Sequence, residues 1–129
     1  MVVACAFQGP LVPGDVPANL AAIEAAARTA DADILISPEM SVTGYNIGSQ
    51  ISELAEPADG PIAESVAAIA RRTGTAIVYG YPESNTDGLP FNAVQAVDAA
   101  GRRLANYRKT HLYGSDKQWF TPGDTWTVQ

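Results

Sequence analysis

The sequence has 129 residues and a hydrophobic content of 47%, which suits one globular domain with a substantial core. Its formal charge of −6 argues against a basic face for nucleic acid and against a polybasic membrane surface. The single cysteine, Cys5, excludes an internal disulfide, and no apolar run approaches the roughly 18 residues of a membrane span, so we predict a cytoplasmic protein without membrane contact.

Apolar runs and turn signals divide the first part of the chain into two strands and two helices. Apolar stretches predict buried strands over 2–7 and 34–36. Asp15 is placed to cap a helix that begins at Val16. A second helix is expected to begin at Gly60-Pro61 and to end before Gly74, because proline suits a first turn and glycine suits the residue after a helix.

The second part of the chain predicts strands only. Residues 75–79 form a short apolar run, 91–98 alternate between apolar and polar, and 103–107 are their hairpin partner across a turn at Gly101. The order β-α-β-α-β-β-β predicts an α/β fold, in which helices cover a sheet that is parallel early and antiparallel late.

Glu39 follows the predicted strand 34–36 directly, at an elbow stiffened by Pro38. Open α/β sheets place their sites where strands end, so Glu39 is a candidate general base. From position alone, a solvated loop glutamate or one that caps the following turn is the alternative.

The segment 107–114 brings three basic side chains to the end of a strand in an otherwise acidic chain. Lys109 is a candidate for stabilising negative charge on an oxyanion, and an ordinary surface lysine is the alternative. His111, the only histidine, is a candidate base or metal ligand. A single histidine more often packs and forms hydrogen bonds, and no second metal ligand stands at a useful spacing.

Two motifs stand in an order and at a separation that resemble a known enzyme family. The first is Ser37-Pro38-Glu39-Met40 with Thr43-Gly44-Tyr45, and the second is Tyr107-Arg108-Lys109-Thr110-His111-Leu112. They resemble the glutamate and lysine motifs of the nitrilase superfamily, the carbon–nitrogen hydrolases. Segments 78–83, 91–93 and 120–124 are also similar to that family, in the expected order.

The resemblance implies the first half of an αββα sandwich, with residues 1–129 as the N-terminal part of a single domain. It implies hydrolysis of a non-peptide carbon–nitrogen bond in a small amide, nitrile or carbamoyl compound, no metal or organic cofactor, and association into a homo-oligomer. In that family a glutamate, a lysine and a cysteine act together. Glu39 would take the thiol proton and later activate water, Lys109 would steady the tetrahedral intermediate, and the cysteine would form a thioester.

The chain departs from the family's pattern in two ways. The family's cysteine lies beyond the segment 120–124, whereas Cys5 lies in the first strand and is expected to be a small buried hydrophobe. We therefore expect a truncated chain that is inactive alone. Asp116 stands where many members have an auxiliary glutamate; it would orient Lys109 or the substrate, pair with Lys117, or start a helix as a solvated residue.

Aromatic side chains complete the candidate site. Tyr45, Tyr113, Trp119 and Trp126 would line a pocket or pack in the core. With Asp116 and His111, Tyr45 and Tyr113 form the candidate auxiliary or substrate-positioning set.

Two other interpretations remain at this stage. The absent nucleophile favours a non-catalytic module that binds a small molecule or assembles with a partner through an open sheet edge. A flavodoxin-like domain has the right early β-α-β order but lacks a phosphate-binding glycine-rich loop, because Gln8-Gly9-Pro10 offers one glycine.

Overall fold

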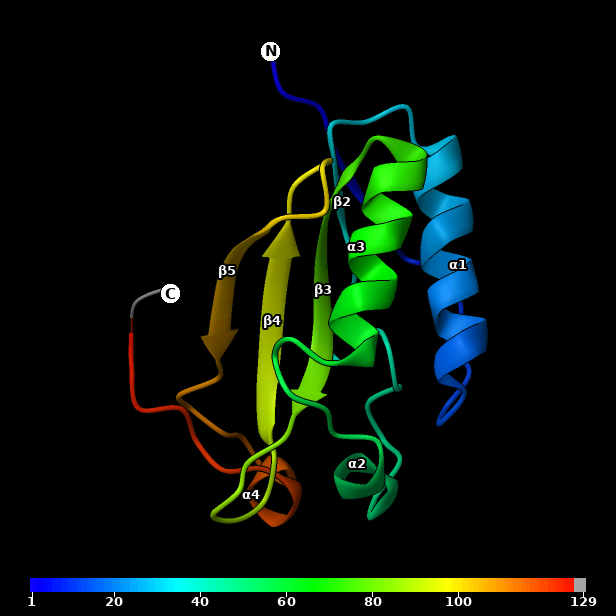
Figure 1. The fold of residues 1–129 in the computed structure, drawn as a ribbon. Coiled ribbons are helices and arrows are strands. Elements are labelled where there is room, and N and C mark those ends of the chain that lie inside the picture. Colours follow the sequence, from blue (N-terminus) through cyan, green and yellow to red (C-terminus); the bar gives the residue numbers. More distant parts are fainter. Residues whose placement is uncertain (127–129) are drawn as a thin grey trace.

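The computed structural model describes residues 1–126, which form one mixed sheet with a layer of helices (Figure 1). In chain order the elements are β1 (Ala4–Ala6), α1 (Val16–Thr29), β2 (Ile34–Ile36), α2 (Gln50–Glu53), α3 (Pro61–Thr73), β3 (Ala76–Glu83), β4 (Phe91–Val97), β5 (Arg103–Arg108) and α4 (Asp116–Trp119).

The two long helices begin and end at the residues that the sequence indicates. Asp15 caps α1, because its carboxylate accepts a hydrogen bond from the Ala18 N–H at 3.0 Å. Gly74, with a left-handed φ of 69°, ends α3. Glu24 of α1 pairs with Arg72 of α3 at 2.8 Å and so joins the two helices. Across residues 1–126, no helix combines the length and apolar character that a membrane crossing requires.

The sheet has the strand order β1-β2-β3-β4-β5. The first three strands are parallel and the last two pair antiparallel, which confirms the prediction and excludes a flavodoxin-like parallel sheet. Because β5 reverses the direction of β4, it runs in the same direction as β2 and β3. The carboxyl ends of β2 and β5 therefore lie at the same end of the sheet, where α2 and α4 also lie (Figure 1).

Helices α1 and α3 cover one face of this sheet (Figure 1). Side chains alternate between the faces of a strand, so Leu35, Ile77 and Tyr79 face the helices and are fully buried there. Cys5 packs against the same core, partly buried. On the opposite face, Ile36 is 45% exposed.

The structure corrects three expectations. The first strand is shorter than 2–7 and is not buried, because β1 pairs only with β2 and Val2 remains 71% exposed. The third strand extends to Glu83. Pro82 is tolerated there because its carbonyl accepts from the Glu56 N–H on the side away from β4, so its missing N–H removes no bond to β4. Helices α2 and α4 are single turns without an apolar repeat; α2 was not predicted, and α4 begins at Asp116, where a helix start was one of the alternatives.

Candidate functional site

Glu39 lies in a tight elbow that begins where β2 ends and packs against β3. The Ser37 N–H and hydroxyl both donate to the Val78 carbonyl at 2.9 Å, and the Val42 N–H donates to the Gly80 carbonyl at 3.1 Å. A Cβ at Gly80 would collide with the backbone of the elbow, so glycine is required at this close approach. The main chain thus places Glu39 over the end of the sheet.

Lys109 follows β5 at the same end of the sheet, and both its main-chain N–H and its carbonyl are hydrogen-bonded. Its N–H donates to the Asn92 carbonyl at 2.8 Å, and its carbonyl accepts from the Gly123 N–H at 2.9 Å. The side chain reaches back toward the elbow, where Nζ lies 2.9 Å from Glu39 Oε1. The topology therefore brings together two residues that are 70 positions apart.

Three further side chains surround this pair. Asp116 is 2% exposed, and its Oδ2 accepts from Lys109 Nζ at 2.8 Å, while its Oδ1 accepts a short hydrogen bond from the Tyr45 hydroxyl. Asn92 Nδ2 donates to Glu39 Oε1 at 2.6 Å. We refer to Glu39, Tyr45, Asn92, Lys109 and Asp116 as the Lys109 cluster.

The charges of the Lys109 cluster stabilise one another. Burial would lower the pKa of Lys109, but the hydrogen bonds to Asp116 and Glu39 outweigh it and raise that pKa. Burial would raise the pKa of Asp116, but the hydrogen bonds from Lys109 and Tyr45 outweigh it and lower that pKa. The hydrogen bond to Asp116 raises the pKa of Tyr45 to about 12. At neutral pH the cluster therefore contains an ammonium, an ionised Asp116 and a neutral phenol.

A hollow of about 250 Å³ opens beside Glu39 and Lys109. Gly80, Val94 and Tyr107 lie opposite one another in the strand register and line it, so it lies on the sheet face away from α1 and α3. An acid–base group and a cation thus meet at an apolar-walled hollow, which is an arrangement suited to polar chemistry on a small molecule.

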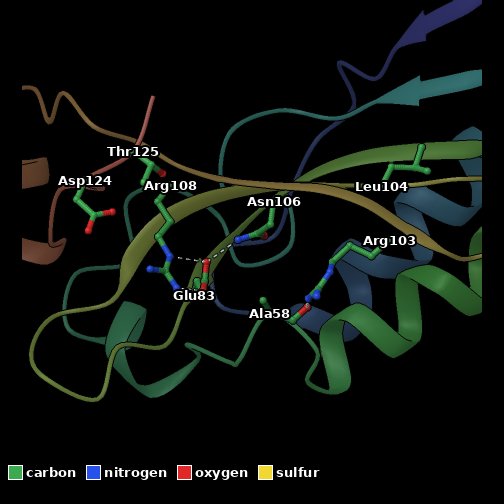
Figure 2. A pocket seen from close by; sticks show the side chains of 8 residues that line it. All are labelled: Ala58, Glu83, Arg103, Leu104, Asn106, Arg108, Asp124 and Thr125. Atoms are coloured by element: carbon green, nitrogen blue, oxygen red, sulfur yellow. Dashed lines mark hydrogen bonds and ion pairs between the residues drawn. The ribbon is translucent and has the colours of Figure 1, made fainter. Parts of the chain in front are cut away.

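A larger hollow of about 370 Å³ lies on the helix-side face of the same sheet (Figure 2). There the Glu83 carboxylate is 5% exposed and accepts from Arg108 Nη2 at 2.5 Å and Nε at 3.2 Å. Asn106 Nδ2 donates to the same carboxylate at 2.9 Å. We call these three residues the Glu83 cluster. Both oxygens of its carboxylate are engaged, so we do not assign the chemistry to this hollow despite its size.

The structure brings two of the candidate auxiliary residues into the Lys109 cluster and leaves the other two outside it. Tyr45 and Asp116 join the Lys109 cluster, and Asp116 starts a helix but is buried and pairs with Lys109, not with Lys117. The His111 ring packs against Trp126 with a centroid distance of 4.9 Å. The Tyr113 side chain is 87% exposed, and only its N–H approaches Asp116.

Sequence reasoning gave no role to Asn92 or Gly80, although both lie in segments that resemble the family. Asparagine is depleted in strands, so an asparagine at position 92 of the predicted strand 91–98 was the available signal. The structure shows that this side chain is buried. Gly80 lies within an apolar run where its close approach to the elbow has no local signature. Within residues 1–126, no three or more His, Cys, Asp or Glu side chains gather as metal ligands would.

Comparisons with known proteins identify relatives of this chain. A sequence profile of the carbon–nitrogen hydrolase family matches residues 4–128. The protein named "hydrolase in pqqF 5′ region" from Pseudomonas protegens is 52% identical over 121 residues, covering 92% of this chain and 42% of that protein. An (R)-stereoselective amidase from a Pseudomonas species is 35% identical over 117 residues, covering 89% and 42%.

Solved structures share the fold. An amidase from a Nesterenkonia species superimposes with a TM-score of 0.84 at 28% identity, over 96% of this chain and 49% of that one. The present chain therefore spans about half of that amidase and less than half of the two curated relatives.

Proposed function

The chain belongs to the carbon–nitrogen hydrolase family, and on that basis we propose that it supplies two members of a Glu-Lys-Cys centre for hydrolysing small amide, nitrile or carbamoyl compounds. The observation that carries the proposal is the direct contact of Glu39 and Lys109, with 2.9 Å between Oε1 and Nζ, at the mouth of the hollow. An isolated surface glutamate or lysine would need neither the elbow on Gly80 nor the buried Asp116.

Glu39 is the proposed general base and acid. Its side chain is 45% exposed, so it can reach both a thiol and a water molecule. For an amide, the thiol sulfur bonds to the carbonyl carbon while Glu39 accepts the thiol proton. Glu39 then returns this proton to the leaving nitrogen as the carbon–nitrogen bond breaks, and an amine or ammonia departs from a thioester.

Hydrolysis of the thioester repeats the same proton transfers. Glu39 accepts a proton from water as the water oxygen bonds to the acyl carbon, and then returns it to the sulfur as the carbon–sulfur bond breaks. The carboxylic acid leaves and the thiol is restored. No proton is gained or lost by the protein over the cycle.

Lys109 is the proposed stabiliser of the tetrahedral intermediate. The pKa of Lys109 is raised by its two carboxylate partners, so the ammonium persists at the pH where the thiol reacts. A fixed positive charge beside the developing oxyanion lowers its energy, and its effect is largest in a site shielded from water. Asp116, held by Tyr45, keeps the ammonium in place.

We propose that the nucleophilic cysteine comes from polypeptide outside the 129 residues. Cys5 packs with the helix-side core, because it is in register with Leu35 and Ile77, whereas the hollow beside Glu39 lies on the other face. A side chain in β1 cannot pass through the sheet to reach a substrate there. Residues 1–129 alone are therefore expected to be inactive.

Ammonia release from small aliphatic amides by the complete polypeptide tests the function. We expect steady release, and a thioester trapped by acid quenching should map by mass spectrometry to a cysteine outside residues 1–129. The 129-residue chain serves as the control and should release no ammonia above background. Absence of release by the complete polypeptide on amides, nitriles and carbamoyl compounds, or an acyl group on Cys5, would overturn the proposal.

A further inference from the structure

We propose that Asn92 is the positioning residue that selects Glu39 Oε2 as the proton-accepting oxygen, an inference that rests on the proposed function. Asn92 is 4% exposed and lies in β4, between the strands that precede Glu39 and Lys109. Its Nδ2 donates to Glu39 Oε1 at 2.6 Å. It is therefore a buried donor aimed at an otherwise accessible carboxylate.

The two donors to Glu39 converge on the same oxygen. Lys109 Nζ lies 2.9 Å from Oε1, the atom that Asn92 also contacts, and among residues 1–126 no group donates to Oε2. Hydrogen bonds to a charged oxygen stabilise it and reduce its readiness to take a proton. The unpartnered Oε2 is thus the stronger acceptor, and it is the oxygen left to face a thiol or a water molecule.

The chemistry of the pair fixes the orientation of the amide. The proposed base is a carboxylate, which only accepts hydrogen bonds from its partners, so Asn92 must present its NH₂ group and not its carbonyl oxygen. An uncharged donor anchors Oε1 without placing a second cation beside the base. Asparagine suits this role better than lysine or arginine would.

Asn92 also sets the distance between the two charged groups. Its main-chain carbonyl accepts from the Lys109 N–H at 2.8 Å, while its side chain holds Glu39. One residue of a central strand therefore anchors the main chain of the cation and the side chain of the base. Displacement of a catalytic group by about 1 Å can cost on the order of 100-fold in rate.

Variants of Asn92 in the complete polypeptide test this role. Asn92→Ala removes the donor, and Asn92→Asp removes it while keeping the size of the side chain. We expect kcat for amide hydrolysis to fall about 10- to 100-fold in both variants, with KM changed by less than about threefold, because the base is misaligned while the hollow stays intact.

Asn106→Ala is the matched control. Asn106 makes the same kind of bond, from Nδ2 to the Glu83 carboxylate at 2.9 Å, on the other face of the sheet. We expect this variant to lose at least as much thermal stability, because Asn106 Oδ1 also accepts from the Tyr81 hydroxyl and from Gln95 Nε2, while kcat stays within about twofold of wild type. An equal fall of kcat in the Asn92 and Asn106 variants, or wild-type kcat in both Asn92 variants, would overturn the inference.

Crystal structures of the wild type and both Asn92 variants separate this inference from the proposed function. If the wild type hydrolyses no substrate, the proposed function fails, but the positional claim is still decided. We expect the Glu39 carboxylate to rotate away from its wild-type position in the variants, while Lys109 keeps its contact with Asp116. An unchanged Glu39 carboxylate in either variant would contradict the role given to Asn92.

Discussion

The two faces of the sheet carry clusters that share three kinds of residue but differ in character. The Glu83 cluster and the Lys109 cluster each contain a glutamate, an asparagine from a central or neighbouring strand, and a cation from the end of β5. The cations are consecutive residues, Arg108 and Lys109. Because successive side chains point to opposite faces, one pair of neighbours serves both clusters.

The difference lies in how completely each carboxylate is satisfied. Glu83 is 5% exposed, and its two oxygens accept three hydrogen bonds, two of them from the planar guanidinium of Arg108. Glu39 is 45% exposed, and only one of its oxygens is bonded. A fully bonded, buried carboxylate stabilises a fold, whereas a half-bonded, accessible one retains the capacity to take a proton.

The largest effect on activity is expected when Glu39 is neutralised, and Glu83 provides the matched comparison. Glu39→Gln should reduce kcat/KM for amide hydrolysis by about 10²- to 10⁴-fold, the usual contribution of a general base, with little change in the free energy of unfolding. Glu83→Gln should retain activity and lose about 1–3 kcal/mol of stability, because Arg108 loses its charged partner. Steady-state kinetics and thermal unfolding measure both. The reverse assignment of effects would refute the comparison.

The two cations provide the next comparison. Lys109→Met should lower kcat by about 10²- to 10³-fold, because the oxyanion loses its positive charge. Arg108→Lys keeps the charge but loses the planar fork, so we expect unfolding to become easier by about 1 kcal/mol with activity retained. Kinetics that barely change in Lys109→Met would remove the lysine from the proposed mechanism.

A smaller effect is expected from the phenol that holds Asp116. Tyr45→Phe keeps the ring and removes one hydrogen bond to a buried carboxylate, worth about 1.5–3 kcal/mol. We expect a roughly 2- to 10-fold fall in kcat, since Lys109 is less firmly held. Tyr113→Phe is the control, because the Tyr113 side chain is 87% exposed, and a larger loss in that variant would point to a different tyrosine.

The pH dependence of unfolding measures how much the ionised Asp116 carboxylate contributes to stability. The pKa of Asp116 is lowered from its ordinary value of 3.8, so its contribution is complete above that pH and is lost as the pH falls through the lower, folded value. Asp116→Asn lacks this titrating group. Its free energy of unfolding should therefore change less between pH 5 and pH 2 than that of the wild type. Parallel curves for the two proteins would contradict the assigned pairing.

The smallest effect is expected at Cys5. Cys5→Ser alters a partly buried side chain on the helix-side core, so activity should stay within about twofold and stability should fall by about 1 kcal/mol or less. Because Cys5 is the single cysteine of the 129 residues, any thiol that still titrates in this variant belongs to a cysteine outside them. Loss of hydrolysis in Cys5→Ser would reinstate Cys5 as a candidate nucleophile.

Local signals were sufficient for the two long helices, α1 and α3, and for the order of the strands along the chain. The cap at Asp15, the left-handed Gly74 and the apolar runs act within a few residues, so the sequence displays them directly. The same holds for Glu39 and Lys109, which stand in motifs at strand ends. The burial of β1 was overestimated because an apolar run does not tell an edge strand from a central one.

The remaining features depend on contacts between distant segments. Asn92 meets Glu39 across 53 positions and Tyr45 meets Asp116 across 71, and neither pairing has a local pattern. The extension of β3 through Pro82 depends on this proline facing the Glu56 segment and not β4, so that its missing N–H costs no bond between the two strands. Such features follow from the strand register, which sequence periodicity alone does not define.

Labelling of the complete polypeptide with 2-chloroacetamide, a small amide-like electrophile, followed by its crystal structure, tests the central claim most directly. We predict one rapidly labelled cysteine, from outside residues 1–129, with the amide group in the hollow between Glu39 and Lys109 and its oxygen within hydrogen-bond reach of Nζ. Labelling should slow markedly in Glu39→Gln and stay unchanged in Glu83→Gln. An adduct on Cys5, or one seated against Glu83 and Arg108, would contradict the account.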